Sequence, residues 1–276
     1  MFGQTPELAV DADSIQVYKG DCRDALEVVK RSTVSLIFTS PPYPGVSQPE
    51  EEYITFPEPK DFNASHEILE QVWRVCFDCL EDLGWLGINI YDIPTGGEVG
   101  MYPNVAATIK RCLSIGFILR ETIIWEKGAS YSPPSGSWPY PKGLLTANTY
   151  EPILIFQKPI QFSQRRRKDP SDYTDSERTQ SKLGPTEHAW LMNPVWRISA
   201  DREARALGHP FTFPEELATR IIRLYSFAGD IVLDPFVGSG TTLIAARKQE
   251  RQGVGFELSD KYVEICQRRF QQGTLL

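Results

Sequence analysis

The sequence predicts an α/β fold with a mainly parallel sheet, and two observations support this prediction. Short runs rich in β-branched and aromatic residues recur along the chain, as in strands that are covered on both faces. Stretches with helical periodicity lie between them, and such alternation is typical of parallel sheets with helices on both faces. The chain has 276 residues, of which 41% are hydrophobic and 24% charged. These values fit one large domain, or one domain with a substantial insertion.

The individual elements follow from local pattern and from the residues at their ends. Seven apolar runs are predicted strands, and in chain order they are Ile15–Tyr18, Val34–Phe38, Trp85–Ile90, Phe117–Trp125, Ile153–Phe156, Ile231–Leu233 and Val254–Phe256. Helices are predicted where a helical period begins at a capping residue, a proline or a glycine-rich turn and stops near a glycine or the chain end. They are Ser65–Leu83, Asn104–Ser114, Pro214–Ser226, Thr241–Gln249 and Asp260–Gln271.

Three long stretches interrupt this alternation: Pro41–Phe62, Gly128–Leu144 and Ile160–Leu207. Irregular stretches of this length inside a compact domain are usually functional or disordered. We expect residues 160–207 to form a small inserted segment. Residues 1–159 and 208–276 are then the two parts of the main domain.

Composition argues against several classes of protein. No run approaches the ~18 consecutive apolar residues of a membrane-spanning helix, and Met1–Ser14 lacks the basic and apolar regions of a signal peptide. Five cysteines, an odd number, fit a reducing cytoplasm better than a disulfide framework. Cys76 and Cys79 lie within a helical pattern and have no second cysteine pair, which favours core packing over a metal site. We expect a cytoplasmic protein that binds no metal and no membrane.

Charge is unevenly distributed along the chain. The net charge is −7, whereas Lys158–Arg205 holds ten Lys and Arg against seven Asp and Glu, and so carries +3. The basic stretch is headed by four consecutive cations, Arg165, Arg166, Arg167 and Lys168. These four residues fit either contact with nucleic acid phosphates or a solvated charge cluster, and the sequence leaves both interpretations open.

A glycine-rich turn near the C-terminus has the pattern of a ligand site. Asp234–Thr242 contains the end of a strand, a turn with Gly238 and Gly240, and the start of a helix. Glycines let a ligand approach the backbone, and a helix N-terminus offers free N–H groups. No Lys precedes Thr241, so the turn is not a phosphate-binding P-loop. An ordinary tight turn is the alternative, but Glu257 at the tip of the next strand is placed to accept hydrogen bonds from ribose hydroxyls.

A proline-rich tetrapeptide ends the second predicted strand. In Ser40-Pro41-Pro42-Tyr43 the prolines fix φ and remove N–H donors, so the Ser40 side chain and nearby carbonyls are left as acceptors. Tyr43 adds a flat aromatic face beside them. Acceptors next to a stacking ring suit an exocyclic amino group on a flat heterocycle. The alternative is a strand-ending turn with a packed tyrosine.

Together the two motifs resemble those of amino-group DNA methyltransferases, which depend on S-adenosylmethionine. The catalytic tetrapeptide comes first, a variable segment next and the cofactor turn last, which is similar to the β-class arrangement. The resemblance covers nearly the whole chain apart from Ile160–Leu207. It implies a Rossmann-like methyltransferase fold that is circularly permuted, with seven strands. When the predicted strands are counted from Ile231–Leu233 to the C-terminus and then onward from the N-terminus, they give the seven strands of this permuted fold.

The resemblance also implies roles for individual residues. The residues expected to be catalytic are Ser40, Pro41, Pro42 and Tyr43. Those expected to bind the cofactor are Asp21, Cys22, Thr39, Pro210, Phe211, Asp234, Pro235, Phe236, Gly238, Ser239, Gly240, Thr241, Thr242, Glu257 and Leu258. Those expected to bind DNA are Trp138, Arg165, Arg166, Arg167 and Lys168. The stretches Ile123–Lys127 and Tyr150–Phe156 resemble the strands that wall the target pocket.

The first residue of the tetrapeptide indicates the target base. Family members with Ser at this position usually methylate cytosine N4, and those with Asp or Asn usually methylate adenine N6. Gly136-Ser137-Trp138 also resembles the cytosine-N4 type. Methylation at cytosine C5 is not expected, because that chemistry usually places a nucleophilic Cys after Pro and no Cys here follows Pro. Adenine N6 stays as the alternative.

The expected reaction is direct methyl transfer to a base that has left the duplex and stacks on Tyr43. We expect the ring face of Tyr43 to matter more than its hydroxyl. Ser40 is a poor general base, so the proton is expected to leave late, with water as a candidate acceptor. Two other classes stay open: a catalytically silent DNA-binding or partner subunit, and an enzyme acting on RNA or a small molecule. The sequence does not reveal the recognition site, a companion restriction endonuclease or a homodimer.

Overall fold

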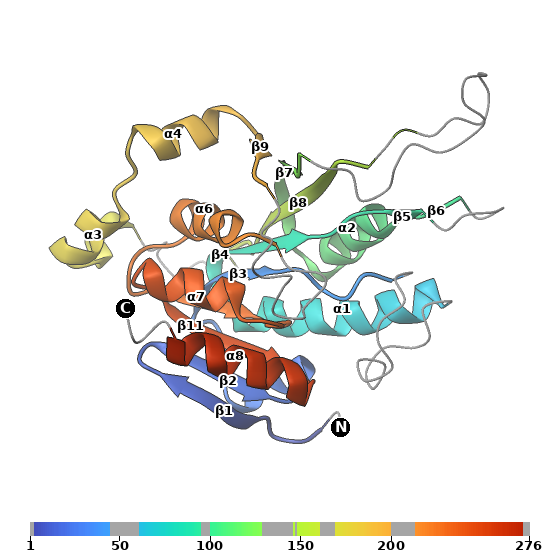
Figure 1. The fold of residues 1–276 in the computed structure, drawn as a ribbon, viewed down its shortest axis with the longest axis horizontal. Helices are drawn as coiled ribbons and strands as arrows, with labels where there is room; N and C mark the ends of the chain where they lie inside the picture. The colour runs from blue at the N-terminus through green and yellow to red at the C-terminus, as the bar shows by residue number, and fades with distance from the viewer. Residues whose placement is uncertain are drawn as a thin grey trace.

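The computed structural model describes residues 3–44, 61–94, 100–128, 146, 148–160, 169–199 and 213–272 of the chain. Its centre is a nine-stranded sheet with the order β1-β2-β11-β10-β3-β4-β8-β7-β9 (Figure 1). The strands are β1 (Glu7–Ala12), β2 (Ile15–Lys19), β3 (Val34–Thr39), β4 (Leu80–Asn89), β7 (Ile118–Glu126), β8 (Tyr150–Gln157), β9 (Val195–Arg197), β10 (Ile231–Asp234) and β11 (Gln252–Glu257). All seven predicted strands are confirmed, and β1 and β9 are additional.

The sheet is mostly parallel. From β2 through β11, β10 and β3 to β4, neighbouring strands run in the same direction. β8 lies antiparallel between β4 and β7, and β1 forms an antiparallel hairpin with β2. The last two strands in the chain, β10 and β11, lie inside the sheet beside strands from the N-terminal half. This arrangement confirms the predicted α/β fold and its permuted strand order.

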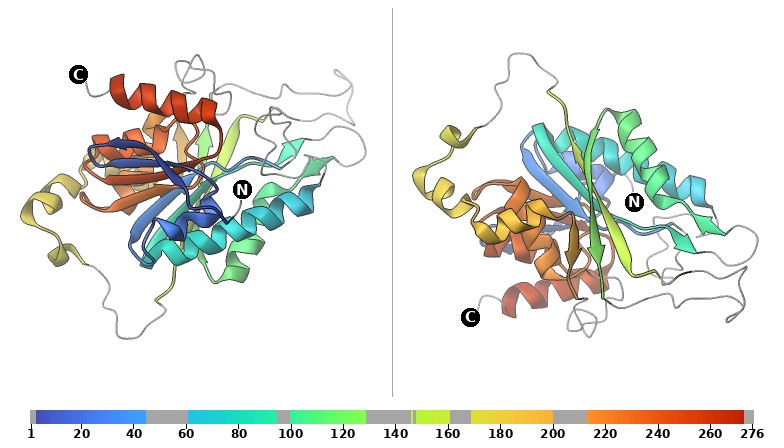
Figure 2. Two further views of the ribbon diagram at one scale, coloured as in Figure 1. Left: turned by 90° about the horizontal axis from the view of Figure 1, so that it is seen from below. Right: turned by 90° about the horizontal axis from the view of Figure 1, so that it is seen from above.

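Helices cover both faces of the sheet (Figure 2). They are η1 (Cys22–Glu27), α1 (Phe62–Cys79), α2 (Asn104–Ile115), η4 (Pro170–Asp172), α3 (Asp175–Ser181), α4 (Pro185–Met192), α6 (Glu215–Tyr225), α7 (Thr241–Lys248) and α8 (Asp260–Gln272). Buried residues of η1, α1 and α2 form a hydrophobic cluster with one side of the sheet. Those of α6, α7 and α8 form two clusters on the other side. A small two-stranded sheet joins β5 (Ile93–Pro94) and β6 (Met101–Tyr102).

The predicted helix Ser65–Leu83 is wrong at both ends. α1 begins at Phe62, where the Asp61 side chain accepts a hydrogen bond from the Ala64 N–H at 3.0 Å. It stops at Cys79 because Leu80 pairs with Val34 of β3. Pairing with a neighbouring strand thus ends the helix before Gly84, although the apolar pattern continues.

Part of the predicted inserted segment, residues 160–207, packs against the main sheet. Within them, Val195–Arg197 forms the edge strand β9, and Trp196 and Ile198 are buried in the core. α4 is tied to α6 because the Arg223 guanidinium donates to Glu187 at 2.9 Å. This part of the segment packs on the sheet because the apolar side chains of Trp196 and Ile198 complete the cover over β7 and α6. The role of residues 160–207 as an inserted target-recognition segment stays a prediction.

The cysteines behave as core residues. Cys76 and Cys79 are buried in the cluster around α1, which confirms their predicted packing role. All five cysteines are free and buried. Burial raises the pKa of the Cys76 thiol well above its ordinary value, so this thiol stays protonated at neutral pH. Among the described helices, none is long and apolar enough to span a membrane.

Candidate active site

The two motifs from opposite ends of the sequence meet at one edge of the sheet. β3 leads into Ser40–Tyr43 and β10 leads into the glycine-rich turn, and the two strands are parallel neighbours, with Ile37 opposite Leu233. From β10 the sheet continues to β11 on one side and to β3 on the other. Ligands of open α/β sheets bind at such a reversal, beyond the carboxyl ends of the strands.

The glycine-rich turn needs its glycines for backbone conformation. Gly238 and Gly240 have φ of 52° and 86°, in the left-handed region that favours glycine. A Cβ atom on Gly240 would lie 2.7 Å from Cys266 Sγ, so α8 also packs too closely for a side chain there. The Arg269 guanidinium of α8 donates to the Ser239 carbonyl at 2.6 Å and to the Thr241 hydroxyl at 3.1 Å, which holds the turn from behind.

Glu257 at the end of β11 lies beside this turn. One carboxylate oxygen, Oε2, accepts a hydrogen bond from the Gly238 N–H at 2.9 Å. The other, Oε1, accepts from the N–H groups of Leu258 and Ser259, both at 2.9 Å. Three backbone donors therefore fix a half-buried carboxylate at the strand tip. This is the position predicted for a contact with ribose hydroxyls.

Asp234 joins the turn to the neighbouring strand. Its Oδ1 accepts from the Thr39 hydroxyl at 2.6 Å and from the Phe236 N–H at 3.0 Å, and its Oδ2 accepts from the Thr242 hydroxyl at 2.7 Å. Burial raises the pKa of Asp234 to about 6, although these hydrogen bonds oppose the shift. The side chains of Thr39, Asp234 and Thr242 are fully enclosed and bonded to one another. These hydrogen bonds hold the turn against β3, and cofactor binding by the three residues stays a prediction.

Asp21 and Cys22 lie where β2 ends, next to Glu257. The Gly20 N–H donates to the Glu257 carbonyl at 3.0 Å, which aligns the two strand ends. The Asp21 carboxylate is engaged by Arg23, whose backbone N–H donates at 2.9 Å and whose Nη2 donates at 2.6 Å. The Cys22 thiol is buried, and burial followed by the Asp21 charge raises its pKa well above the ordinary value. Both residues thus lie at the predicted edge, with Asp21 capping η1.

The other predicted cofactor residues of the turn divide by burial. Pro235, Ser239 and Thr241 are buried, whereas Phe236 is half-buried and meets Trp73 edge to face, with ring centroids 6.3 Å apart. Leu258 follows Glu257 and is half-buried. The remaining predicted positions lie outside the described residues, namely Pro210, Phe211, Trp138, Arg165, Arg166, Arg167 and Lys168.

The tetrapeptide contains a hydrogen-bond network that the sequence did not reveal. Ser40 Oγ donates to Tyr43 Oη at 2.9 Å. The single Tyr43 phenol proton is shared between two acceptors at 3.1 Å, the Asn89 carbonyl and Glu151 Oε2, and Tyr43 Oη accepts from Asn89 Nδ2 at 2.9 Å. The Tyr43 ring meets Tyr91 edge to face, with centroids 5.2 Å apart. Because the Ser40 proton is directed at Tyr43, the Ser40 lone pairs are left to accept an N–H.

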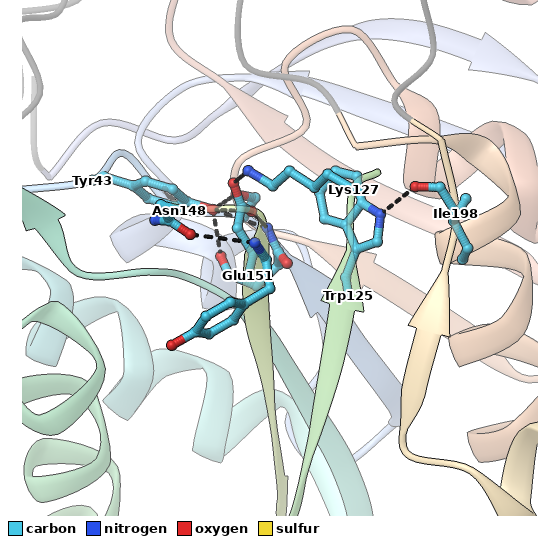
Figure 3. Close-up of polar contacts among 9 residues, drawn as sticks. Tyr43, Trp125, Lys127, Asn148, Glu151 and Ile198 are labelled. Atoms are coloured by element: carbon cyan, nitrogen blue, oxygen red, sulfur yellow. Dashed lines mark hydrogen bonds and ion pairs between the residues drawn. The ribbon is translucent and has the colours of Figure 1, made fainter. Parts of the chain in front are cut away.

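A buried ion pair lies at the end of this network (Figure 3). The Lys127 ammonium pairs with Glu151, and both side chains are less than a tenth exposed. Lys127 Nζ also lies 5.2 Å from the ring centroid of Trp125, whose indole N–H donates to the Ile198 carbonyl at 2.8 Å. The sequence analysis placed Glu151 and Lys127 in strands that resemble the wall of the target pocket, but it predicted no individual role for either residue. Charged residues at the ends of otherwise apolar strands are the sequence signal that could have singled them out.

Comparison with known proteins decides the family. The family model of DNA methylases that act on N6 or N4 matches residues 34–268. The chain belongs to this family. Among its relatives, the type II methyltransferase M.MthZI of Methanothermobacter thermautotrophicus is 32% identical over 93% of the chain and 76% of the relative. The type II methyltransferase M.MjaI of Methanocaldococcus jannaschii is 30% identical over 91% of the chain and 89% of the relative.

Solved structures agree with the fold of this methyltransferase. A protein of Thermus thermophilus, described as a DNA modification methylase and complexed with S-adenosyl-L-methionine, is 31% identical, covers 93% of both chains and has a TM-score of 0.72. PvuII DNA methyltransferase, described as cytosine-N4-specific, has a TM-score of 0.69 and covers 99% of this chain, but at 20% identity it shows the fold alone.

S-adenosyl-L-methionine is the cofactor of the methyltransferase. The residues present fit it on two counts. The left-handed turn at Gly238 keeps side chains away from a ligand, and the half-buried Glu257 carboxylate is an acceptor that suits ribose hydroxyls. The cofactor supplies an electrophilic methyl group when it is bound.

Proposed function

We propose that this DNA methyltransferase transfers a methyl group directly to N4 of cytosine in duplex DNA. The observation that supports the base assignment most is Ser40 at the head of the tetrapeptide. Its hydroxyl is a neutral acceptor whose own proton is directed at Tyr43 Oη, 2.9 Å away. The resemblance associates Ser at this position with cytosine N4. Adenine N6 is the second candidate, since both bases carry an exocyclic amino group.

The proposed role of the tetrapeptide is to orient that amino group. Ser40 Oγ and the Pro41 carbonyl accept its two N–H groups, which turns the nitrogen lone pair out of conjugation and toward the methyl group. The Tyr43 ring stacks on the flipped base. No group in this arrangement needs to become a nucleophile, so positioning supplies most of the rate.

The proposed DNA contacts are Trp138 in the stretch Gly128–Leu144 and four cations in the basic stretch. Trp138, Arg165, Arg166, Arg167 and Lys168 are the residues assigned to this role, with the segment 160–207 as the place where the sequence is recognised. We also propose a cytoplasmic location and a companion restriction endonuclease. The second proposal is supported by the type II methyltransferase names of M.MthZI and M.MjaI.

Nucleoside mass spectrometry tests the proposed product. Duplex DNA of mixed sequence is incubated with the protein and S-adenosyl-L-methionine, then digested, and N4-methylcytosine is expected as the main modified nucleoside. A majority of N6-methyladenine contradicts the base assignment and leaves direct transfer intact. A folded protein that binds DNA but yields no methylated nucleoside supports the silent-subunit alternative. Parallel reactions with RNA test the choice of duplex DNA.

A further inference from the structure

Two hydrogen bonds lead from Ser40 through the Tyr43 hydroxyl to Glu151. Ser40 Oγ donates to Tyr43 Oη at 2.9 Å, and Tyr43 Oη donates to Glu151 Oε2 at 3.1 Å. The three groups therefore form a line from the tetrapeptide, where the target amino group is proposed to lie, to a buried carboxylate on β8. Only the last group in this line is a carboxylate that can take up a proton at neutral pH.

Methyl transfer to an amino group releases a proton, so the reaction needs a proton acceptor. The nitrogen that gains a methyl group carries one proton too many and is a strong acid until it loses that proton. The Ser40 hydroxyl cannot keep this proton, because its conjugate base and its protonated form are both unstable near neutral pH. A carboxylate within reach of the same hydroxyl accepts it readily.

The Glu151 carboxylate is held by side chains from two neighbouring strands. Lys127 pairs with it from the end of β7, and Asn89 Nδ2 donates to it from β4. The other titratable groups that face it are the phenols of Tyr43 and Tyr91, which follow β3 and β4. These contacts hold the Glu151 carboxylate in place beside Tyr43 Oη.

Tyr43 is the middle group of the line. Burial, and after it the Glu151 charge, raises the pKa of the Tyr43 phenol well above its ordinary value. The phenol therefore stays protonated and donates, rather than holding a charge of its own. Its ring position is fixed by the edge contact with Tyr91 and by the two hydrogen bonds with Asn89.

We propose that Ser40, Tyr43 and Glu151 form a proton relay that removes the proton released during methyl transfer. The inference rests on the proposed placement of the target amino group at Ser40. As the nitrogen–methyl bond forms and the sulfur–methyl bond breaks, sulfur keeps the bonding pair. The extra nitrogen proton passes to Ser40 Oγ, the Ser40 proton to Tyr43 Oη, and the Tyr43 proton to Glu151 Oε2. Ser40 and Tyr43 end neutral, and Glu151 ends as a carboxylic acid beside Lys127.

The relay assigns positioning roles to two residues. Asn89 and Lys127 hold the carboxylate against the Tyr43 hydroxyl. Both the cytosine and the adenine amino group release a proton in the same way, so the relay does not depend on which base is methylated.

Single-turnover kinetics with Glu151→Gln and Tyr43→Phe test the relay. Each variant is expected to slow methyl transfer by about 100- to 1,000-fold, within the usual range for a lost proton acceptor. Affinity for DNA by fluorescence anisotropy and for S-adenosyl-L-methionine by calorimetry is expected to stay within about threefold, since neither binding step moves a proton through the relay. Glu121→Gln is the matched control, because Glu121 also lies on β7 but accepts a hydrogen bond from the Tyr225 hydroxyl, outside the network.

Two further measurements separate a relay from a purely structural network. Glu151→Asp, which keeps a carboxylate on a shorter arm, is expected to recover at least about tenfold over Glu151→Gln. In the double variant the losses are expected not to multiply, because the two residues act in one chain of transfers.

Several results overturn the relay. They are a Glu151→Gln rate within threefold of wild type, losses that multiply in the double variant, or a Glu151→Asp rate no higher than that of Glu151→Gln. If Glu151→Gln does not fold because Lys127 is left unpaired, Tyr43→Phe carries the test alone, since it removes one hydroxyl and leaves no buried charge. A wild-type product other than N4-methylcytosine contradicts the base assignment only. A relay variant that makes the wild-type product at the wild-type rate contradicts the relay only.

Discussion

The Thr39 hydroxyl donates a 2.6 Å hydrogen bond to Asp234, although the two residues are 195 positions apart in the chain. The bond is buried and ties the end of β3 to the end of β10. It therefore fixes the distance between the tetrapeptide, which begins at the next residue, and the glycine-rich turn. The tetrapeptide and the glycine-rich turn are held in register by this contact.

Thr39→Val is expected to destabilise the protein. The substitution keeps the shape of the side chain but removes one of the donors to a buried carboxylate, a loss worth about 1–3 kcal/mol in the free energy of unfolding. Urea unfolding at pH 7 measures it. Thr39→Ser keeps the hydroxyl and serves as the control. Equal losses in the two variants would assign the effect to packing of the methyl group and not to the hydrogen bond.

Asp234→Asn is expected to change the pH dependence of stability. Burial raises the pKa of Asp234 from 3.8 to about 6, so the folded protein holds this proton more tightly than the unfolded chain does. The contribution of Asp234 to stability is therefore complete below pH 3.8 and is lost as the pH rises through 6. Because an amide does not ionise, the free energy of unfolding of the variant should rise relative to that of wild type between pH 4 and pH 7, by about 3 kcal/mol at most.

Urea unfolding at several pH values measures this gain. Asp11→Asn, at an exposed position of β1, is the control. The difference in its free energy of unfolding from wild type should stay constant over this pH range. A difference between Asp234→Asn and wild type that stays constant from pH 4 to pH 7 would show that Asp234 does not titrate in this range.

Gly238→Val is expected to abolish binding of S-adenosyl-L-methionine. Gly238 has a φ of 52°, which a β-branched residue rarely adopts, and its N–H holds Glu257. A distorted turn loses both its close approach to the ligand and its carboxylate partner. Calorimetry measures the binding. Gly100→Val is the control, since Gly100 also has a positive φ of 76° but nothing lies within 4 Å of an added Cβ. Unchanged affinity in a folded Gly238→Val protein would refute the assignment of the turn.

Ser40→Ala is expected to lower the turnover number and leave cofactor affinity unchanged. The Ser40 contact with the amino group strengthens as the nitrogen becomes tetrahedral, so its loss acts on the transition state. A decrease of about 100-fold is expected, by comparison with other preorganised hydrogen bonds at reacting centres. Steady-state kinetics separate the turnover number from KM. A rise in KM at an unchanged turnover number would indicate that Ser40 only binds the base.

Neutralising Arg165, Arg166 and Arg167 together is expected to weaken DNA binding and flatten its salt dependence. Each lost phosphate contact releases about one counterion fewer, so the slope of log affinity against log salt should become shallower by up to about 3. Affinity for S-adenosyl-L-methionine should stay constant. The control triple is Arg31, Arg74 and Arg268, which are exposed arginines elsewhere on the surface. If both triples have the wild-type salt slope, the run is a solvated charge cluster.

The sequence by itself determined the strand and helix alternation, the order of the two motifs and the residues of both turns. These features are local: runs of apolar residues, glycines and prolines act within a few positions of themselves. The seven central strands were predictable for that reason. β9 was not, because three residues carry too little pattern and its place depends on pairing with β7. The early end of α1 was missed for the same reason, since pairing of Leu80 with Val34 competes with the helical period.

Only the tertiary structure decided which polar groups meet. The Thr39–Asp234 bond and the contact between Tyr43 and Glu151, 108 positions apart, depend on the order and register of neighbouring strands. The sequence therefore led to the expectation that the Tyr43 ring matters more than its hydroxyl, whereas the fold places that hydroxyl between Ser40 and a buried carboxylate. The physical reason is that buried polar atoms must find partners, and the available partners are set by packing rather than by sequence separation.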